Sequence, residues 1–544
     1  MDKFCTRCGA KLDEATKLCP NCDLIPKMEK RQISRTKKRS RFYMKLILCI
    51  LLFSTLSVCV TGILMHFKII SFPFISSENT TPSNENKNLT FKNGDYVFTP
   101  SQEYIQYDEK NSVLYFNNQL IVYTFSNLSE DHANSLAERI DGKIVGSISG
   151  QVNALQIQVK TSSLDELSSM SAQLMELPDV LYAGYDYPIQ LLSTTNASNL
   201  QGIAETISTS TQNSENNSSE IPWWADAIGA DSAWNYSEKC QPIKIGIIDS
   251  GFDTEHEDLE GRITFLPEYT ANSKDNHGTH VAGIIAANNN TIGIRGIADS
   301  ASLVCVDWSP DESTNYLSTG EYIEIIKQLI EADTKVINNS WGTHFLSKDG
   351  YTQNLYGKGS GIKYLFEYFA VHSTGAYDSY VDYCEAFSKR SGLDCAIMMI
   401  ELMLNGQDDF LIIQAAGNGK DNAGPGVDAH YTSFFSSIDL ETYNILSDST
   451  RKTLFQKGIE YSTIDEHLLI VGAVENKCDE QGYRMSQYSN FGPNVDICAP
   501  GGSGKNYSGE NILSTLADND YGELFGTSMA APMWSPEVLR LFGP

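Results

Sequence analysis

The chain has 544 residues, more than a single domain of ordinary size, and a formal net charge of −28. The charge is uneven, because residues 1–45 hold 13 Lys and Arg against 5 Asp and Glu, whereas the rest of the chain holds 27 against 63. An acidic body of this kind repels nucleic acid, so no nucleic-acid partner is expected. The composition predicts several domains, with a basic segment confined to the N-terminal end.

Residues 1–26 contain two Cys-x-x-Cys turns, formed by Cys5 with Cys8 and by Cys19 with Cys22. Two such turns can deliver four thiolates to the corners of a tetrahedron, and a reducing compartment keeps the thiols as ligands instead of disulfides. The four cysteines therefore predict a structural Zn²⁺ site in a segment that resembles the short zinc ribbons at the N-termini of many bacterial membrane proteins. Iron in a rubredoxin-like knuckle is the alternative.

An uncharged and largely apolar run occupies residues 46–65, directly after a basic juxtamembrane segment at 27–45. The run is long enough to cross a bilayer as one helix, with a buried core helix as the alternative. Because Lys and Arg precede the run, the positive-inside rule places the N-terminus in the cytoplasm and the rest outside the cell membrane. The lipid bilayer is therefore an expected partner, and contact with anionic lipid explains the basic residues.

The next three segments differ in polarity. Residues 66–112 are expected to form a polar stalk, since the part from Ser71 to Asn93 is rich in Ser, Asn, Thr and Glu. Residues 113–192 place apolar strands and amphipathic helices in the order strand, helix, strands, helix, strand, which predicts a ferredoxin-like α+β module. An unrelated adapter module is the alternative. Residues 193–220 are polar again and predict a linker open to proteolysis.

Residues 221–544 carry polar side chains suited to nucleophilic catalysis. A buried parallel strand at 244–248 is expected to end in Asp249, at the sheet edge where α/β folds build their sites. His277 is expected at the start of a helix of small residues, Asn418 follows an apolar run, and Ser528 lies in a turn of small residues. A serine hydroxyl becomes a nucleophile when a base removes its proton and a second group orients that base.

The stretch from Pro222 to Pro536 resembles the subtilisin-like serine proteases, or subtilases. The motifs that carry the resemblance are Asp249-Ser250-Gly251, His277-Gly278-Thr279-His280-Val281-Ala282-Gly283, Val336-Ile337-Asn338-Asn339-Ser340-Trp341-Gly342, Ala416-Gly417-Asn418 and Gly526-Thr527-Ser528-Met529-Ala530-Ala531-Pro532. The resemblance implies a three-layer α/β fold with a central parallel sheet. It also implies a serine endopeptidase, with Ser528 as nucleophile, His277 as general base and then acid, Asp249 as the orienting carboxylate and Asn418 as oxyanion donor.

Two further segments resemble the family's edge segments on either side of the specificity pocket, Ser340, Trp341 and Gly342 and, on the opposite side, Ala415, Ala416 and Gly417. A protein or peptide substrate would pair with them by backbone hydrogen bonds. Trp341 either lines this pocket or belongs to the core. Many subtilases carry Ca²⁺, and the acidic body favours cations, but no regular Asp/Asn loop here places a calcium ion.

Subtilases commonly carry an N-terminal prodomain of ferredoxin-like plan that blocks the cleft until it is cleaved. The resemblance therefore implies that residues 113–192 act as an intramolecular inhibitor. Cleavage in the linker at 193–220 would free the catalytic domain from its membrane anchor. The chain would then be a zymogen, held at the membrane and released after cleavage.

The sequence departs from the family in two places. Gly342 and Ala415 are separated by 72 residues, and this Tyr-rich insertion at 343–414 either overhangs the cleft or decorates the solvent side. The chain also ends 16 residues after Ser528, where Pro536 is expected to break the helix, so the C-terminus is expected to be truncated. Two alternatives follow: a catalytically impaired membrane-bound scaffold, or a protein whose zinc ribbon is the interacting part.

Overall fold

The structure is a computed structural model that describes the following residues: 86–108, 110–125, 129–161, 163–189, 221–237, 243–271, 275–308, 316–342, 376–407, 409–419, 424–479, 482–505 and 507–542. All of them belong to one compact unit, Pro82–Pro544. The expected zinc ribbon, basic segment and membrane span lie outside the described residues. Within the described segments no helix has both the length and the apolar character needed to cross a bilayer.

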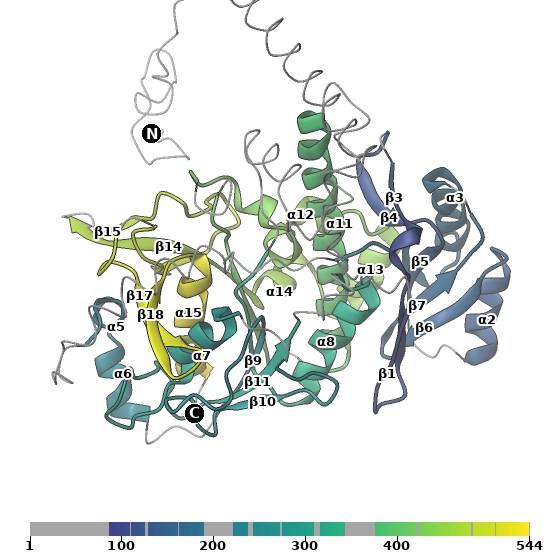
Figure 1. Cartoon of the computed structure of the whole chain (residues 1–544). Helices are drawn as coiled ribbons and strands as arrows, with labels where there is room; N and C mark the ends of the chain where they lie inside the picture. Colours follow the sequence, from purple (N-terminus) through teal and green to yellow (C-terminus); the bar gives the residue numbers. More distant parts are fainter. Residues whose placement is uncertain are drawn as a thin grey trace, which may run out of the picture. The chain divides into compact units, whose positions relative to one another are not determined.

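A mostly parallel sheet, built from strands between Lys244 and Pro500, forms the centre of the larger part of this unit (Figure 1). Its strands lie in the spatial order β10 (Ile263–Phe265), β11 (Ser302–Asp307), β9 (Lys244–Asp249), β12 (Val336–Asn339), β13 (Leu411–Ala415), β14 (Leu468–Asp479) and β15 (Gly482–Met485), with β16 (Ile497–Pro500) beside β14. Only β15 runs antiparallel to its neighbour among these strands. The carboxyl ends of β9, β12 and β13 therefore meet at one edge.

Alternate residues of the parallel strands enter two different cores. Ile247 and Ile413 pack with α7 (His277–Ala286) and α15 (Thr527–Phe542) on one face, whereas Ile248 and Ile412 pack with α8 (Thr319–Glu331) and α11 (Ala376–Leu404) on the other. Apolar residues at successive positions of one strand point to opposite faces, so near-continuous apolar runs are needed when helices cover both faces. Figure 1 shows these helices on either side of the sheet.

A second sheet belongs to residues 87–189. The chain forms the centre of this sheet and its two helices in the order β5 (Gln119–Phe125), α2 (Glu130–Glu138), β6 (Lys143–Ile148), β7 (Val152–Gln158), α3 (Leu164–Met175) and β8 (Val180–Tyr185). The strands lie side by side as β6-β7-β5-β8, all antiparallel. Leu120 and Val122 face α2 and α3 on one side, while Ile121 and Tyr123 face α8 and α11 on the other. We call residues 87–189 the module.

The module begins earlier than the sequence indicated. Strands β1 (Lys87–Thr90) and β2 (Tyr96–Thr99) extend its sheet beside β6, and η1 (Gln102–Tyr104) leads to the hairpin of β3 (Ile105–Asp108) and β4 (Val113–Phe116). The polar stalk expected over 66–112 is therefore wrong for residues 87–108. The segment is polar overall, which led to the wrong expectation. A few of its side chains, among them Phe91 and Val97, are nevertheless buried and attach these short strands to the core.

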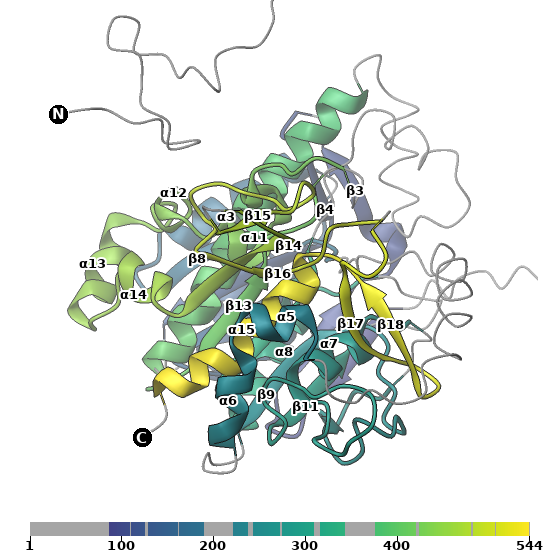
Figure 2. The same ribbon diagram turned by 90° about the vertical axis from the view of Figure 1, so that its left-hand side faces the viewer.

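The remaining elements surround the larger sheet. They are α5 (Trp223–Ala227), α6 (Ala230–Ser237), η2 (Ala429–Thr432), η3 (Phe434–Ser437), α12 (Leu440–Tyr443), α13 (Asp448–Gln456), α14 (Tyr461–Asp465) and the hairpin of β17 (Ile512–Leu516) and β18 (Asp520–Leu524). Figure 2 shows α12, α13 and α14 on the side of the sheet away from this hairpin. The hairpin packs on α7, because Ser514 donates to the carbonyl oxygen of His280 at 2.8 Å.

Helix α11 lies within the insertion at 343–414 and corrects both expectations for that part of it. The helix neither overhangs a cleft nor decorates the surface, because Leu393, Ile397 and Ile400 are buried in the core shared by the larger sheet and the module. The other part of the insertion, residues 343–375, lies outside the described residues. An inserted segment thus supplies much of the surface on which the module packs.

Helix α15 corrects a third expectation. It continues through Pro536 to Phe542, so the predicted break at Pro536 is wrong. Proline removes one backbone hydrogen bond from a helix. The preceding turns are fixed by the core, where Met529, Ala530 and Met533 are buried.

Candidate active site

The carboxylate of Asp249 and the imidazole of His277 form a buried pair. Asp249 is the last residue of β9 and His277 the first of α7, and Nδ1 of His277 lies 2.6 Å from Oδ1 of Asp249. The backbone N–H of Ser250 donates to the same oxygen at 2.7 Å. A carboxylate at Nδ1 fixes the tautomer that carries the proton there, which leaves Nε2 as the basic nitrogen.

Close packing of α7 holds the imidazole in place. Every residue of this helix is buried, and a Cβ built on Gly283 would lie 2.2 Å from Oγ1 of Thr515. The small residues of the motif therefore let the hairpin β17–β18 approach the helix backbone. The second histidine, His280, is part of this packing, since its Nε2 lies 3.0 Å from the carbonyl oxygen of Ile512 and its pKa is lowered to about 3 by burial.

The pKa of His277 is raised above its ordinary value. Burial disfavours the imidazolium, but the charge of Asp249, its hydrogen bond and the charge of Asp275 together outweigh that effect. Asp275 lies two residues before His277 and accepts a hydrogen bond from the hydroxyl of Ser250 at 2.8 Å. The site is therefore built to stabilise a positive imidazolium.

The side-chain amide of Asn418 is oriented by Thr527. Oδ1 of Asn418 accepts from the backbone N–H of Thr527 at 2.8 Å and from its hydroxyl at 2.9 Å. Two donors on the oxygen identify which end of the amide it is, and they direct the Nδ2 amino group to the other side. A Cβ built on Gly526 would lie 3.1 Å from that Nδ2, so the glycine leaves room beside the donor.

Ser528 lies in the first turn of α15 and is tied to the end of β12. Its carbonyl oxygen accepts from the hydroxyl of Ser340 at 2.8 Å, and Ser340 in turn accepts from Nδ2 of Asn338 at 2.9 Å. Pro532 explains this link, because a proline four residues later has no N–H for the carbonyl of Ser528. The nucleophile candidate is thereby fixed to the same sheet edge as Asp249.

The two expected substrate segments lie at neighbouring strand ends. Ser340, Trp341 and Gly342 follow β12, and Ala415, Ala416 and Gly417 form the end of β13 and the residues after it, while β12 and β13 are paired in parallel. The backbone N–H of Gly417 donates to the hydroxyl of Thr527 at 3.0 Å. Both segments are thus bonded to the serine-bearing turn.

Trp341 is a core residue. It is 2% exposed and packs edge-on against Phe434, with ring centroids 4.9 Å apart, and against Tyr322 at 5.7 Å. Of the two roles that the sequence left open, the structure supports the core aromatic. Its neighbours in the segment, Ser340 and Gly342, keep the positions described above.

The module contacts the carboxyl edge of the larger sheet through its last described residue. The backbone N–H of Ile189 donates to the carbonyl of Leu317 at 2.7 Å, and the N–H of Leu317 donates back at 2.8 Å. Leu317 precedes α8, which connects β11 to β12, so it lies at the edge where the parallel strands end. Asp186 of the module also accepts from the N–H of Thr319, in the first turn of α8.

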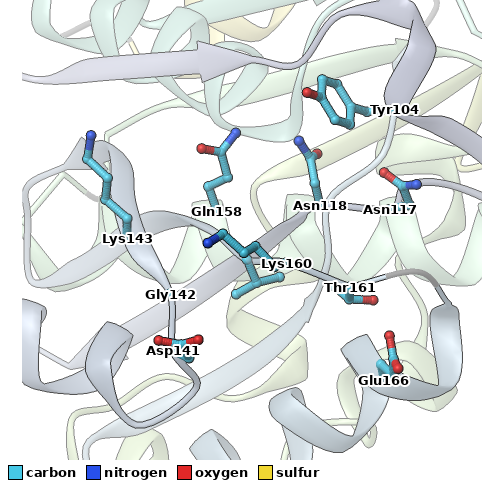
Figure 3. Close-up of a pocket in the computed structure, with 11 residues that line it drawn as sticks. Tyr104, Asn117, Asn118, Asp141, Gly142, Lys143, Gln158, Lys160, Thr161 and Glu166 are labelled. Carbon is cyan, nitrogen blue, oxygen red and sulfur yellow. The ribbon is translucent and has the colours of Figure 1, made fainter.

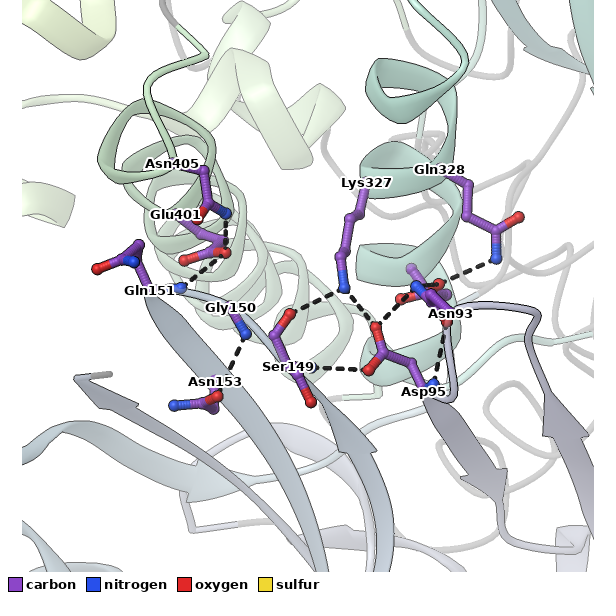
Figure 4. Close-up of polar contacts among 11 residues, drawn as sticks. Asn93, Asp95, Ser149, Gly150, Gln151, Asn153, Lys327, Gln328, Glu401 and Asn405 are labelled. Carbon is purple, nitrogen blue, oxygen red and sulfur yellow. Dashed lines mark hydrogen bonds and ion pairs between the residues drawn. The ribbon is translucent and has the colours of Figure 1, made fainter. Parts of the chain in front are cut away.

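Charged groups fix the other end of the module to α8 and α11 (Figure 4). The ammonium group of Lys327 contacts the carboxylate of Asp95 and, at 2.9 Å, the carbonyl of Ser149. Glu401 of α11 accepts from the backbone N–H groups of Gln151 and Val152, and burial raises its pKa to about 7. These contacts join residues that are 178 to 250 positions apart in the sequence.

A cavity of about 860 Å³ lies in the module, and none of the expected site residues line it (Figure 3). Its wall includes Lys143, Lys160 and Glu166 together with Asn117 and Asn118. Nothing in its chemistry matches nucleophilic catalysis.

In the part of the chain that the structure describes, no three His, Cys, Asp or Glu side chains gather closely enough to hold a metal ion. The four N-terminal cysteines lie outside that part.

Sequence reasoning missed two contributors to this site. Thr527 was recognised only as part of a motif, although its two hydrogen bonds orient Asn418. Asp275 was not considered, although it adds a second negative charge near His277. The position of each beside a candidate catalytic residue was the available signal.

Comparisons with known proteins bear on the family of this chain. A model of the Subtilase family matches residues 241–538. The chain is 27% identical over 325 residues to the major intracellular serine protease of Bacillus subtilis (strain 168), covering 58% of this chain and 72% of that protein. It is 37% identical over 129 residues to subtilisin E of the same organism, covering 22% of this chain and 32% of that protein. Fervidolysin from Fervidobacterium pennivorans, a keratinolytic enzyme related to subtilisin, superimposes with a TM-score of 0.44 and 17% identity, covering 79% of this chain and 55% of the other.

Proposed function

This chain belongs to the subtilase family of serine endopeptidases, and we propose that it hydrolyses peptide bonds with Ser528 as nucleophile, His277 as general base and acid, and Asp249 as the orienting carboxylate. The observation that carries this proposal is the buried contact of 2.6 Å between Nδ1 of His277 and Asp249. The pair lies at the sheet edge to which Ser340 ties the backbone of Ser528. Protein or peptide chains are the substrates.

In the proposed mechanism, the basic Nε2 of His277 takes the proton of the Ser528 hydroxyl as its oxygen attacks the carbonyl carbon. The charge of Asp249 stabilises the imidazolium that forms. Nδ2 of Asn418 donates to the oxyanion of the tetrahedral intermediate, an orientation supported by the bonds from Thr527 to Oδ1. His277 then returns the proton to the leaving amine, and water hydrolyses the acyl-enzyme by the same steps in reverse.

The same proposal makes the module an intramolecular inhibitor. The backbone bonds between Ile189 and Leu317 support it, because they form a strand-like pairing at the sheet edge, the kind of contact that an extended substrate would make. Cleavage in the linker at 193–220 would sever the module from the catalytic part. The proposed zymogen is held at the cell membrane by residues 46–65, with the catalytic part outside.

The N-terminal cysteines complete the proposal. Cys5, Cys8, Cys19 and Cys22 would hold a structural Zn²⁺ in the cytoplasm, and their residue types and spacing support zinc over calcium. Metal analysis of the purified full chain, with and without Cys5→Ser and Cys8→Ser, tests this part independently of proteolysis. Loss of about one equivalent of zinc is expected, and unchanged metal content would contradict it.

Covalent labelling of Ser528 by a fluorophosphonate probe tests the catalytic proposal directly. After cleavage in the linker at 193–220, by the chain itself or by an added protease, the wild-type protein is expected to be labelled, and Ser528→Ala to abolish labelling. Ser535→Ala is the matched control, since Ser535 is a buried serine of the same helix that bonds to Asn338 instead. A folded wild-type chain that takes no label after this cleavage would favour the alternative of a catalytically silent membrane-bound scaffold.

A further inference from the structure

Thr432 fills the space between the two substrate segments. A Cβ built on Gly342 would lie 2.4 Å from Cγ2 of Thr432, and one built on Gly417 would lie 2.4 Å from its Oγ1. The same side chain therefore contacts both glycines from between them. It is 1% exposed, so its methyl and hydroxyl occupy the room that two residues without side chains would otherwise leave.

Hydrogen bonds fix this side chain on both sides. Its hydroxyl donates to the carbonyl of Ala416, in one of the two segments, and accepts from Nδ2 of Asn490 at 3.0 Å. Oδ1 of Asn490 in turn accepts from the backbone N–H groups of Gly419 and Val427, each at 2.9 Å. Because both roles of the hydroxyl are used, Thr432 cannot rotate away without losing buried hydrogen bonds.

The backbone after Thr432 is strained in a way that maintains this placement. Ser433 has φ 67° and ψ −172°, a region that is essentially limited to glycine, and Phe434 follows with φ 55°. Helix α11 supports the bend, since the hydroxyl of Ser391 accepts from the N–H of Phe434 at 3.0 Å. Such strain persists where the surroundings fix it, and it is frequent at ligand-binding sites.

The bend places two side chains at once. Thr432 lies between Gly342 and Gly417, while Phe434 packs against Trp341 with ring centroids 4.9 Å apart and against Phe387 of α11 at 5.7 Å. Trp341 is thereby held in the core. Neither aromatic ring is positioned to give way to a substrate, so the threonine is backed by a rigid cluster.

We propose that Thr432 is a specificity-determining residue, whose side chain closes the pocket between the two segments so that the residue on the amino side of the cleaved bond must be small. Glycine, alanine and serine fit this description. The inference rests on the proposed function, because it takes the two segments as the walls of the substrate pocket. A bulky aliphatic or aromatic side chain would need the volume that the methyl of Thr432 occupies.

Three variants separate volume from hydrogen bonding. Thr432→Ser removes the methyl and keeps the hydroxyl, whereas Thr432→Val keeps the shape and removes the hydroxyl. Thr442→Ser is the matched control, since Thr442 is also buried in the connection between β13 and β14 and donates to a backbone carbonyl, that of Ser437, at 3.0 Å. Activity is measured as kcat/KM on peptides that differ only in having alanine or leucine before the cleaved bond.

The wild-type protein, once cleaved in the linker at 193–220, is expected to prefer alanine to leucine. Thr432→Ser is expected to raise the leucine-to-alanine ratio by roughly tenfold or more, the range in which one methylene is discriminated in an apolar pocket. Thr432→Val and Thr442→Ser are expected to leave the ratio within about twofold of wild type. Thermal unfolding of each variant identifies any loss that comes from misfolding.

A cleavage profile of the wild-type chain on a peptide library keeps the inference testable even if Thr432→Ser does not fold. A preference for large residues before the cleaved bond, in a chain whose serine is labelled by fluorophosphonate, would overturn the role of Thr432 and leave the proposed protease intact. An unchanged ratio in a folded Thr432→Ser would do the same. A folded wild-type chain that takes no label after cleavage in the linker at 193–220 would overturn the protease, and this inference with it.

Discussion

Two buried carboxylates, Asp249 and Asp394, differ in how completely their oxygens are hydrogen-bonded. Asp394 of α11 accepts from the hydroxyl of Tyr123 at 2.6 Å, from that of Tyr187 at 2.8 Å and from the guanidinium of Arg390 at 2.8 Å. Both of its oxygens therefore have fixed partners. Asp249 directs both of its protein contacts, from His277 and Ser250, to Oδ1, and Oδ2 has no hydrogen-bond partner within the described residues.

The difference separates a structural charge from a proposed catalytic one. The carboxylate at the module interface pairs with a permanent cation, and Arg390 also lies 4.8 Å from the centroid of the Tyr182 ring. A buried charge is tolerated when it is paired and fully hydrogen-bonded. Asp249 instead faces an imidazole whose charge changes during the proposed reaction, so its incomplete bonding lets it respond to that change.

The largest effect is expected from Asp249→Asn. The amide would present no charge to His277 and would favour the wrong tautomer, which in a serine protease lowers kcat on the order of 10⁴-fold. Turnover of a peptide substrate by purified enzyme, compared with thermal unfolding of the same samples, separates catalysis from folding. A loss below about tenfold in a folded variant would show that Asp249 does not orient the base.

The second prediction concerns stability at the module interface. Asp394→Leu would leave the guanidinium of Arg390 buried without its partner, which costs about 3–5 kcal/mol of unfolding free energy. Denaturant unfolding of the full chain measures it. The double variant Arg390→Met with Asp394→Leu should recover part of the loss, since no unpaired charge remains although the hydroxyls of Tyr123 and Tyr187 still lose their acceptor.

An exposed pair provides the matched control for that experiment. Lys110 and Asp165 lie 3.4 Å apart and both are largely exposed, so Asp165→Asn should change the unfolding free energy by about 1 kcal/mol or less. Equal losses in Asp394→Leu and Asp165→Asn would mean that burial does not distinguish the two pairs.

The same contrast explains what the sequence could predict. Asp249, His277, Asn418 and Ser528 were identified because each lies at a strand end or helix start inside a short motif. Parallel β9, β12 and β13 then bring these motifs to one edge. The element order of the module from β5 to β8 followed in the same way from local periodicity. Local signals suffice where the residues that matter are close in sequence to the element that positions them.

The interface could not be predicted, because its partners are distant in sequence. Arg390 and Asp394 are four residues apart, a spacing typical of an exposed ion pair on a helix. The hydroxyls that make their burial tolerable come from Tyr123 and Tyr187, which are 271 and 207 residues away from Asp394. Thr432 was overlooked for the same reason, since its contacts with Gly342 and Gly417 exist only in the folded chain.

The third prediction tests the oxyanion donor. Asn418→Ala should lower kcat by roughly 10²–10³-fold, a magnitude established for such a donor in subtilisin, with little change in KM. Thr527→Val is the graded comparison, because it keeps the backbone N–H bond to Oδ1 of Asn418 and removes the hydroxyl, which donates to that oxygen and accepts from the N–H of Gly417. We expect a smaller loss in kcat there. An equal or larger loss would assign Thr527 a role of its own.

The smallest effect is a shift in pH dependence. His277 must be neutral to accept the serine proton, and although burial disfavours its imidazolium, Asp249 and Asp275 raise its pKa above the ordinary value of 6.5. A plot of kcat/KM against pH should therefore fall as the pH drops through a value above 6.5, since protonation of the free enzyme's base removes activity.

Asp275→Asn removes one of the two negative charges and should move this fall to lower pH. The amide oxygen introduced by this substitution can keep the bond from the backbone N–H of Asn276, and the Ser250 hydroxyl can accept from the amide nitrogen, so the fold of Asp275→Asn is expected to persist. A fall centred below 6.5 in the wild-type chain, or one that Asp275→Asn leaves in place, would mean that these carboxylates do not set the charge state of the imidazole.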